Sequence, residues 1–166
     1  MKYIRFFIGF TLFLTVIMSG CSVPKRLTKE EKIAQEALLR AAIENRTFIV
    51  EVDRALPMSG SSRMLTSPYT LQLNGDEVKS YLPYFGRAYS VPYGGGEGLI
   101  FESTVTDYQC SFDKKGKATI EFKTRSKDDQ FIYLIHIFAD GSSSMNVTST
   151  NRQPISFNGK SYAKKE

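Results

Sequence analysis

The strongest constraint on the fold is an alternation of apolar and polar residues that begins at Thr47 and continues almost to the end of the chain. Phe48, Val50 and Val52 show it first, and residues 117–125 repeat it more clearly. A period of two is typical of strands with one buried and one wet face. Turn signals separate the segments at residues 74–75, 113–116, 126–129 and 140–141. Because no β-α-β alternation is present, these short connections predict antiparallel pairing of consecutive strands.

One helix is expected ahead of the strands, at residues 28–45. Thr28, followed three residues later by Glu31, matches the capping-box pattern. One half of the helical wheel is apolar and predicts the face that packs on the sheet. The residues on that half are Ile33, Ala34, Ala37, Leu38, Ala41 and Ala42, whereas Leu39 and Ile43 fall outside it. Its alanines would let the helix lie close against a sheet.

The segment at residues 131–139 is apolar on both faces, so it predicts a central strand covered on its second side by the helix. A last short strand pair is expected at residues 155–157 and 161–162, on either side of Asn158-Gly159. Together these patterns predict a mainly β fold with one N-terminal helix. The sheet is expected to be a curved antiparallel sheet, a sandwich or a partly open barrel, with the helix packed on it.

The first residues have the layout of an export signal. Lys2 and Arg5 precede an uncharged apolar run at residues 6–18, which is shorter than the ~20 residues that a membrane-spanning helix needs. The following Met18-Ser19-Gly20-Cys21 resembles the lipobox of bacterial lipoproteins, although Leu is usual where Met18 stands. Two other interpretations of this segment are a cleaved signal of a secreted protein without lipid and a membrane-spanning helix. We expect a signal peptide at residues 1–20, a tether at 21–27 and a single domain at 28–166.

The lipobox resemblance implies that Cys21 carries a diacylglycerol and becomes the first residue of the mature chain. Two acyl chains give a stable membrane anchor. Residues 22–26 are basic, which favours a lipid-anchored protein of the cell envelope that faces the periplasm. The chain has 22 Lys and Arg against 17 Asp and Glu, and losing Lys2 and Arg5 lowers its net charge from +5 to +3. This mixed, mild charge does not indicate a nucleic-acid partner.

The residues most often used in catalysis do not form a catalytic pattern. His136 is the only histidine, no G-x-S-x-G accompanies it, and we expect it to be a core residue bonded to backbone. Asp128 and Asp129 are interpreted as a charged turn. Cys110 shares a strand face with Tyr108 and Phe112, which predicts a buried, inert thiol. We therefore expect no enzyme activity, no metal site and no cofactor.

An aromatic and glycine-rich segment at residues 81–98 is the candidate binding site. Aromatic faces beside a guanidinium suit a sugar, a peptide or a base. The candidate ligand- or partner-binding residues are Tyr81, Tyr84, Phe85, Arg87, Tyr89 and Tyr93. In the other interpretation, the tyrosines close one end of the sheet and the glycines supply positive φ.

The same segment resembles a known family. Residues 81–89, with Pro92-Tyr93 and residues 98–101, are similar to the core of a family of small lipoproteins from Bacteroides-like gut bacteria. That family is catalogued as a domain of unknown function, and the likeness covers about residues 31–162. The resemblance implies an extracytoplasmic β-rich domain and no established activity.

The function expected from the sequence is a non-enzymatic binding or structural module, anchored by lipid at Cys21. Its partner would be an envelope protein, a glycan or a lipid. A periplasmic carrier of lipid or lipoprotein, with an apolar cup in the sheet, is the alternative. A hydrolase is a remote third class, because no sequence feature supports it.

Overall fold

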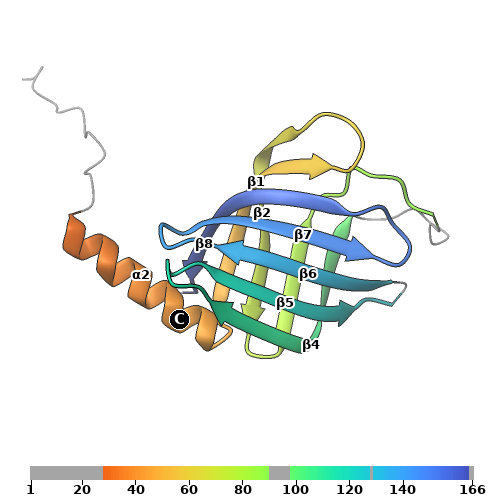
Figure 1. The fold of residues 1–166 in the computed structure, drawn as a ribbon. Coiled ribbons are helices and arrows are strands. Elements are labelled where there is room, and N and C mark those ends of the chain that lie inside the picture. The colour runs from red at the N-terminus through yellow and green to blue at the C-terminus, as the bar shows by residue number, and fades with distance from the viewer. Residues whose placement is uncertain (1–27, 90–97, 128, 165–166) are drawn as a thin grey trace, which may run out of the picture.

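A computed structural model describes residues 28–89, 98–127 and 129–164. Within them, one helix precedes eight strands, which form a closed antiparallel barrel in chain order (Figure 1). The elements are α2 (Lys29–Glu44), β1 (Phe48–Pro57), β2 (Arg63–Asn74), β3 (Glu77–Leu82), β4 (Leu99–Phe112), β5 (Ala118–Arg125), β6 (Gln130–Ile137), β7 (Ser142–Ser149) and β8 (Ile155–Ala163). No helix in the described part of the chain is long and apolar enough to cross a membrane.

The mainly β fold and its antiparallel connections are confirmed. The predicted turns join β2 to β3, β4 to β5 and β6 to β7, and Asp113 shows how: its Oδ1 accepts hydrogen bonds from the N–H groups of Lys115 and Lys117. The sandwich and the open barrel are not found, because β1 pairs along its length with β8 and closes the sheet. Among the described strands, closure leaves no unpaired first or last strand.

The predicted turn at Asn158-Gly159 is wrong, because both residues lie inside the continuous strand β8. Gly159 pairs with Val52 where β1 has a bulge, between Val52 and Arg54. A Cβ atom at Gly159 would overlap the carbonyl oxygen of Glu51, so this glycine permits a close backbone approach instead of a turn. The bulge increases the local bend of β1, which helps the barrel to close.

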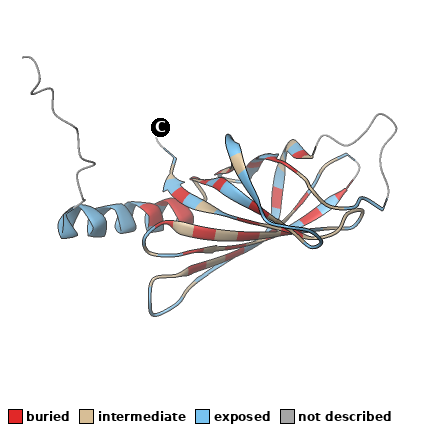
Figure 2. Cartoon of the chain, turned by 90° about the horizontal axis from the view of Figure 1, so that it is seen from above, coloured by how far each residue is buried: buried red, intermediate tan, exposed pale blue. Residues whose placement is uncertain are grey.

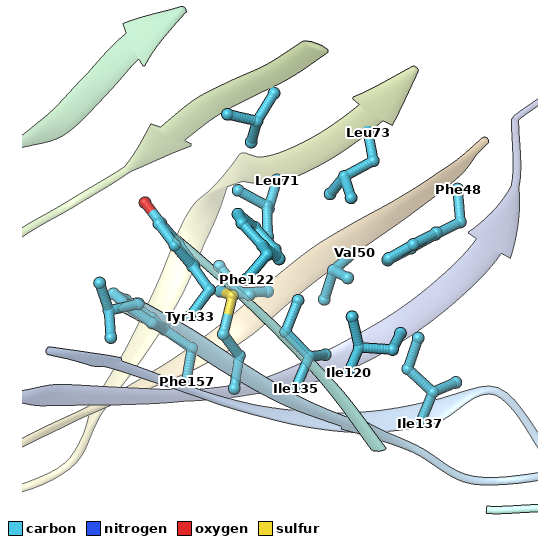
Figure 3. Close-up of a cluster of buried hydrophobic side chains, with 14 of the residues drawn as sticks. Phe48, Val50, Leu71, Leu73, Ile120, Phe122, Tyr133, Ile135, Ile137 and Phe157 are labelled. Atoms are coloured by element: carbon cyan, nitrogen blue, oxygen red, sulfur yellow. The ribbon is translucent and has the colours of Figure 1, made fainter. Parts of the chain in front are cut away.

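The barrel interior is filled by side chains (Figure 3). Its largest fully buried members include Tyr133, Phe48, Phe122 and Phe157. The rings of Phe122 and Tyr133 stack with centroids 4.9 Å apart. The buried Tyr133 hydroxyl donates to Ser80 Oγ at 3.1 Å, and Ser80 Oγ donates to the Leu99 carbonyl at 2.7 Å. Each buried side chain of this size stabilises the fold by about 2–3 kcal/mol. The barrel interior is therefore the hydrophobic core of the domain.

Helix α2 begins as predicted but packs through a different face. Its Thr28 Oγ1 accepts from the Glu31 N–H, and the Glu31 carboxylate accepts from the Thr28 N–H. The predicted stripe is largely wrong, since Ile33 and Leu38 are 58% and 64% exposed and Ala42 is its one buried member. The buried residues are Leu39, Ala42 and Ile43, all in the C-terminal half. Figure 2 shows the other half extending away from the barrel, with exposed residues.

The predicted cover over β6 is also absent. The helix contacts β8 and β1 at the end of the barrel, so the outer face of β6 stays uncovered among the described residues. Ile132 on β6 and Phe138 just after it are exposed. His136 lies half-buried on this outer face, with Nδ1 3.2 Å from Thr119 Oγ1, and is therefore not a core histidine bonded to backbone.

Cys110 is exposed, which contradicts the predicted burial. The pairing of β3 with β4 ends at Glu77 and Thr104, so the second half of β4 extends past β3. A bulge at Asp107, with φ of 53°, places Cys110 opposite Ile120, so Tyr108, Cys110 and Phe112 share one strand face as predicted, but that face is only partly covered at this end of β4. Tyr108 and Phe112 contact the helix end of the molecule there: the Tyr108 hydroxyl donates to the Ile43 carbonyl, and the Arg40 guanidinium lies over the Phe112 ring.

Candidate functional site

The end of the barrel away from the helix is crossed by a strap, which we define as residues 83–89 after β3. The strap lies against the connection between β7 and β8. Tyr89 N–H donates to the Asn151 carbonyl at 2.7 Å, and Gln153 N–H donates to the Arg87 carbonyl at 3.0 Å. Ala88 and Arg152 form a short antiparallel bridge between them. These backbone bonds hold the strap as if it were a short additional strand.

Tyr84 is the central contact of the strap. Its hydroxyl lies 2.9 Å from the Arg87 carbonyl and 3.0 Å from the Gln153 carbonyl, so it donates to one or the other. The Arg152 guanidinium lies 5.3 Å from the centre of its ring. Burial raises the pKa of Tyr84, and the nearby Arg152 opposes that change. Tyr84 is therefore a neutral hydrogen-bond donor that ties the strap to the barrel.

A largely buried ion pair between Asp129 and Arg152 lies beside Tyr84. Asp129 Oδ1 accepts from the N–H groups of Gln130, Thr150 and Asn151 at 2.9–3.2 Å. Its Oδ2 lies 3.7 Å from Arg152 Nε, and the other end of the guanidinium donates to the Gly98 carbonyl at 2.7 Å. We call Asp129, Arg152 and Tyr84 the latch. It joins the strap, the start of β4 and two interstrand connections.

Phe85 closes the same end with apolar surface. It is half-buried against the core, and the Arg63 guanidinium lies 4.7 Å from the centre of its ring. Gly86, the next residue, lies so close to the Tyr84 hydroxyl that an added Cβ would overlap it. The strap therefore needs a residue without a side chain between its inward aromatic residues and its exposed part.

The structure divides the candidate binding residues into three groups. Tyr84 and Phe85 point inward and close the barrel, whereas Arg87 and Tyr89 are exposed, Tyr89 by 70%. Tyr81 lies on the outer face of β3 and stacks on Tyr69, with ring centroids 5.4 Å apart. Tyr93 lies outside the described residues. The strap thus combines closure of the barrel, by its inner side chains, with an exposed aromatic and basic surface.

Two latch residues are absent from the sequence-based set. The sequence pattern predicts a charged turn at Asp129, but the side chain is buried. Arg152 lies far from the aromatic segment in sequence, and no local pattern connects the two. An aspartate after a short turn, ahead of a strongly apolar strand, is the one available signal, since such a carboxylate is well placed to accept backbone N–H groups.

The described residues of the strap end show no arrangement that is typical of a catalytic centre. Among the described residues, no three His, Cys, Asp or Glu side chains gather in a way that would hold a metal ion. His136 and Cys110 lie on other parts of the barrel, at β6 and at the helix end of β4. The chemistry available at the strap is stacking, cation–π contact and hydrogen bonding.

The fold and the strap define a small eight-stranded antiparallel barrel with a helix at one end and a latched strap at the other. The chain belongs to the DUF4251 family, described as a domain of unknown function, which matches residues 30–161. A crystal structure of a DUF4251 family protein from Bacteroides eggerthii DSM 20697 is similar, with a TM-score of 0.60 and 17% identity over 80% of this chain and 91% of that one. No curated protein matches the chain significantly.

Proposed function

We propose that the protein is a non-enzymatic binding module of the cell envelope, anchored by lipid at Cys21, and that its partner docks on the exposed side of the strap. The observation that carries this proposal is the arrangement of the two ends. Helix α2, which follows the lipobox, lies at one end, and the strap lies at the other (Figure 1). A lipid at Cys21 is seven residues from Thr28, at most about 25 Å of extended chain. The strap end is therefore the end free to meet a partner.

The composition of the strap end supports a docking role. Tyr89 is largely exposed although aromatic, and the exposed Arg87 lies two residues before it. Tyr and Arg are enriched at the centres of binding interfaces because they combine apolar area with directional hydrogen bonds. Backbone bonds hold both residues in place, so little conformational entropy is lost when a partner binds.

The interior of the barrel does not favour the carrier alternative. A lipid or lipoprotein carrier needs an apolar cup, whereas the interior positions hold Tyr133, Phe122, Phe157 and their neighbours in full burial. A hollow of about 370 Å³, formed by described residues, lies on the outside of β2, β3 and β4. The proposed recognition therefore uses outer surfaces.

The anchor is tested by metabolic labelling with radioactive palmitate. We expect palmitate label in the wild-type protein and none in Cys21→Ser. Cys110→Ser is the matched control, because it removes the exposed cysteine of the barrel and leaves the lipobox intact. Label that persists in Cys21→Ser would overturn the anchor.

The docking surface is tested by a photo-crosslinking residue in place of Tyr89, with the exposed Lys115 in the turn between β4 and β5 as the matched control position. In living cells, the residue at position 89 is expected to give a discrete crosslinked product that position 115 does not give. Equal products at both positions, or none at position 89, would contradict docking at the strap.

A further inference from the structure

The outer face of β2, β3 and β4 carries a hollow that belongs neither to the strap nor to the core. Its volume is about 370 Å³. The pairing of the strands places two rows of outward side chains across it: Gln72, Lys79 and Glu102 in one row, and Asn74, Glu77 and Thr104 in the next. Lys164, just after β8, lines it from the side. The pairing of the three strands supplies a firm base for these side chains.

The hollow is polar but balanced in charge. Lys79 and Lys164 oppose Glu77 and Glu102, and Lys79 forms an ion pair with Glu102. A strongly charged ligand would therefore meet both attractive and repulsive charges in the hollow. The amides of Gln72 and Asn74 each offer both donors and acceptors, as does a hydroxyl. This set of groups matches a neutral ligand that carries many hydroxyls.

An apolar platform adjoins the hollow. The next row of outward side chains, toward the strap, consists of Thr70, Tyr81 and Ile100. Tyr81 is 43% exposed, and its stack on Tyr69 holds the ring in one orientation. On the opposite flank, Tyr162 of β8 belongs to the same row as Gln72, through Ile49 of β1. Tyrosine rings present an apolar face and a polar edge.

We propose that this outer face binds a neutral oligosaccharide. The C–H face of a pyranose ring packs on Tyr81, while the ring hydroxyls exchange hydrogen bonds with the amides and charged groups of the hollow. An extended peptide is a poorer match, since the three strands are paired with one another here and offer no free edge for a peptide backbone. The inference goes beyond the proposed function, because it needs neither the lipid anchor nor a partner at the strap.

The test is a nuclear magnetic resonance titration of the chain from residue 21, carrying Cys21→Ser, with maltohexaose, cellohexaose, mannohexaose and xylohexaose at millimolar concentration. At least one of them is expected to shift the backbone amides of residues 72–79 and 102–104 in a saturable way. Two charged hexaoses serve as controls: hexagalacturonate is negative and chitosan hexaose is positive. Both are expected to bind at these amides more weakly than the neutral hexaoses. No shift at these amides with any neutral hexaose, or equal binding of the charged ones, would overturn the inference.

Variants then separate this face from the rest of the molecule. Tyr81→Ala is expected to weaken binding about five- to tenfold, the effect of losing one aromatic contact. Gln72→Ala is expected to weaken it by a smaller factor and serves if Tyr81→Ala unfolds. Phe138→Ala is the control, because Phe138 is an aromatic residue of similar exposure (45%) just after β6. An unchanged Kd in both Tyr81→Ala and Gln72→Ala would contradict the site, whatever the crosslinking at position 89 gives.

Discussion

One end of the barrel is covered by a helix that contacts it through apolar side chains, and the other by a strap held mainly through polar bonds. At the helix end, Leu39, Ala42 and Ile43 are buried against the strand ends. At the strap end, Tyr84 and the Asp129–Arg152 pair make the connections. An apolar cover needs no directional bonds, whereas the strap fully buries only Pro83 and partly buries Tyr84 and Phe85. The strap is therefore positioned by hydrogen bonds, which leaves its outer aromatic residue, Tyr89, exposed.

The largest expected effect comes from removing the latch carboxylate. Asp129→Ala leaves three backbone N–H groups and the Arg152 guanidinium buried without their acceptor, and should lower the free energy of unfolding by about 3–5 kcal/mol. Asp76→Ala is the control at the helix end, because Asp76 forms an exposed ion pair with Arg46 worth about 0–1 kcal/mol. Urea unfolding measures the free energy of unfolding of both variants. Equal losses of stability would contradict the proposed difference between the strap end and the helix end.

The helix end should respond to lost apolar volume instead. Ile43→Ala removes a helix side chain that is buried against the barrel and should lower the free energy of unfolding by about 2–4 kcal/mol. Leu38→Ala, on the exposed side of the same helix, should change the free energy of unfolding by less than about 0.5 kcal/mol. Thermal or urea unfolding distinguishes the two variants. A larger loss for Leu38→Ala would mean that the helix packs through the face predicted from the sequence.

A smaller effect is expected from the strap hydroxyl. Tyr84→Phe keeps the ring but removes the donor to the Arg87 or Gln153 carbonyl, and should cost about 1 kcal/mol. Tyr89→Phe, on the exposed part of the strap, should leave the stability unchanged. Hydrogen exchange at Tyr89 and Gln153 N–H provides a local readout, with faster exchange expected in Tyr84→Phe. Unchanged exchange in that variant would show that the backbone bonds alone hold the strap.

The smallest effect concerns the thiol at the helix end. Although Cys110 is exposed, neighbouring atoms displace part of the water around its sulfur and raise its pKa; the hydrogen bond with Tyr108 lowers the pKa, and the Glu44 carboxylate raises it. Since the thiolate is the reactive form, a raised pKa lowers the thiolate fraction at any pH below it. Alkylation of Cys110 at pH 8 should therefore be several-fold slower than that of a free cysteine, and its rate should rise at higher pH. Glu44→Gln should speed alkylation slightly, and a rate equal to that of free cysteine would contradict the shielding.

The sequence predicted the antiparallel order of the strands because turns are local. Asp113 with Gly116, and Asp140 with Gly141, carry their turn chemistry within four residues. Closure of the barrel could not be predicted in this way, because it depends on β1 pairing with β8 across most of the chain. The same long-range pairing explains the wrong turn at Gly159, whose partner at the β1 bulge, Val52, is distant in sequence.

Local sequence patterns could not predict the packing of the helix or the contacts of the latch. The half of the wheel with Ile33 and Leu38 is the more continuous apolar face, but only the last two turns of the helix reach the barrel. The aromatic strap was found from composition, and the interpretation of Tyr84 as a residue that closes the sheet agrees with its contacts. Arg152 and Asp129 meet Tyr84 only after the barrel has formed, so no spacing in the sequence joins them.

We propose that the barrel interior is a sealed core and that recognition takes place on the outside. Native mass spectrometry of the purified chain from residue 21, carrying Cys21→Ser, tests both statements. We expect a mass equal to that of the polypeptide alone, and no acyl chains in an organic extract of the same sample. A lipid bound in stoichiometric amount, whose release shifts the resonances of Tyr133 and Phe122 inside the barrel, would contradict it.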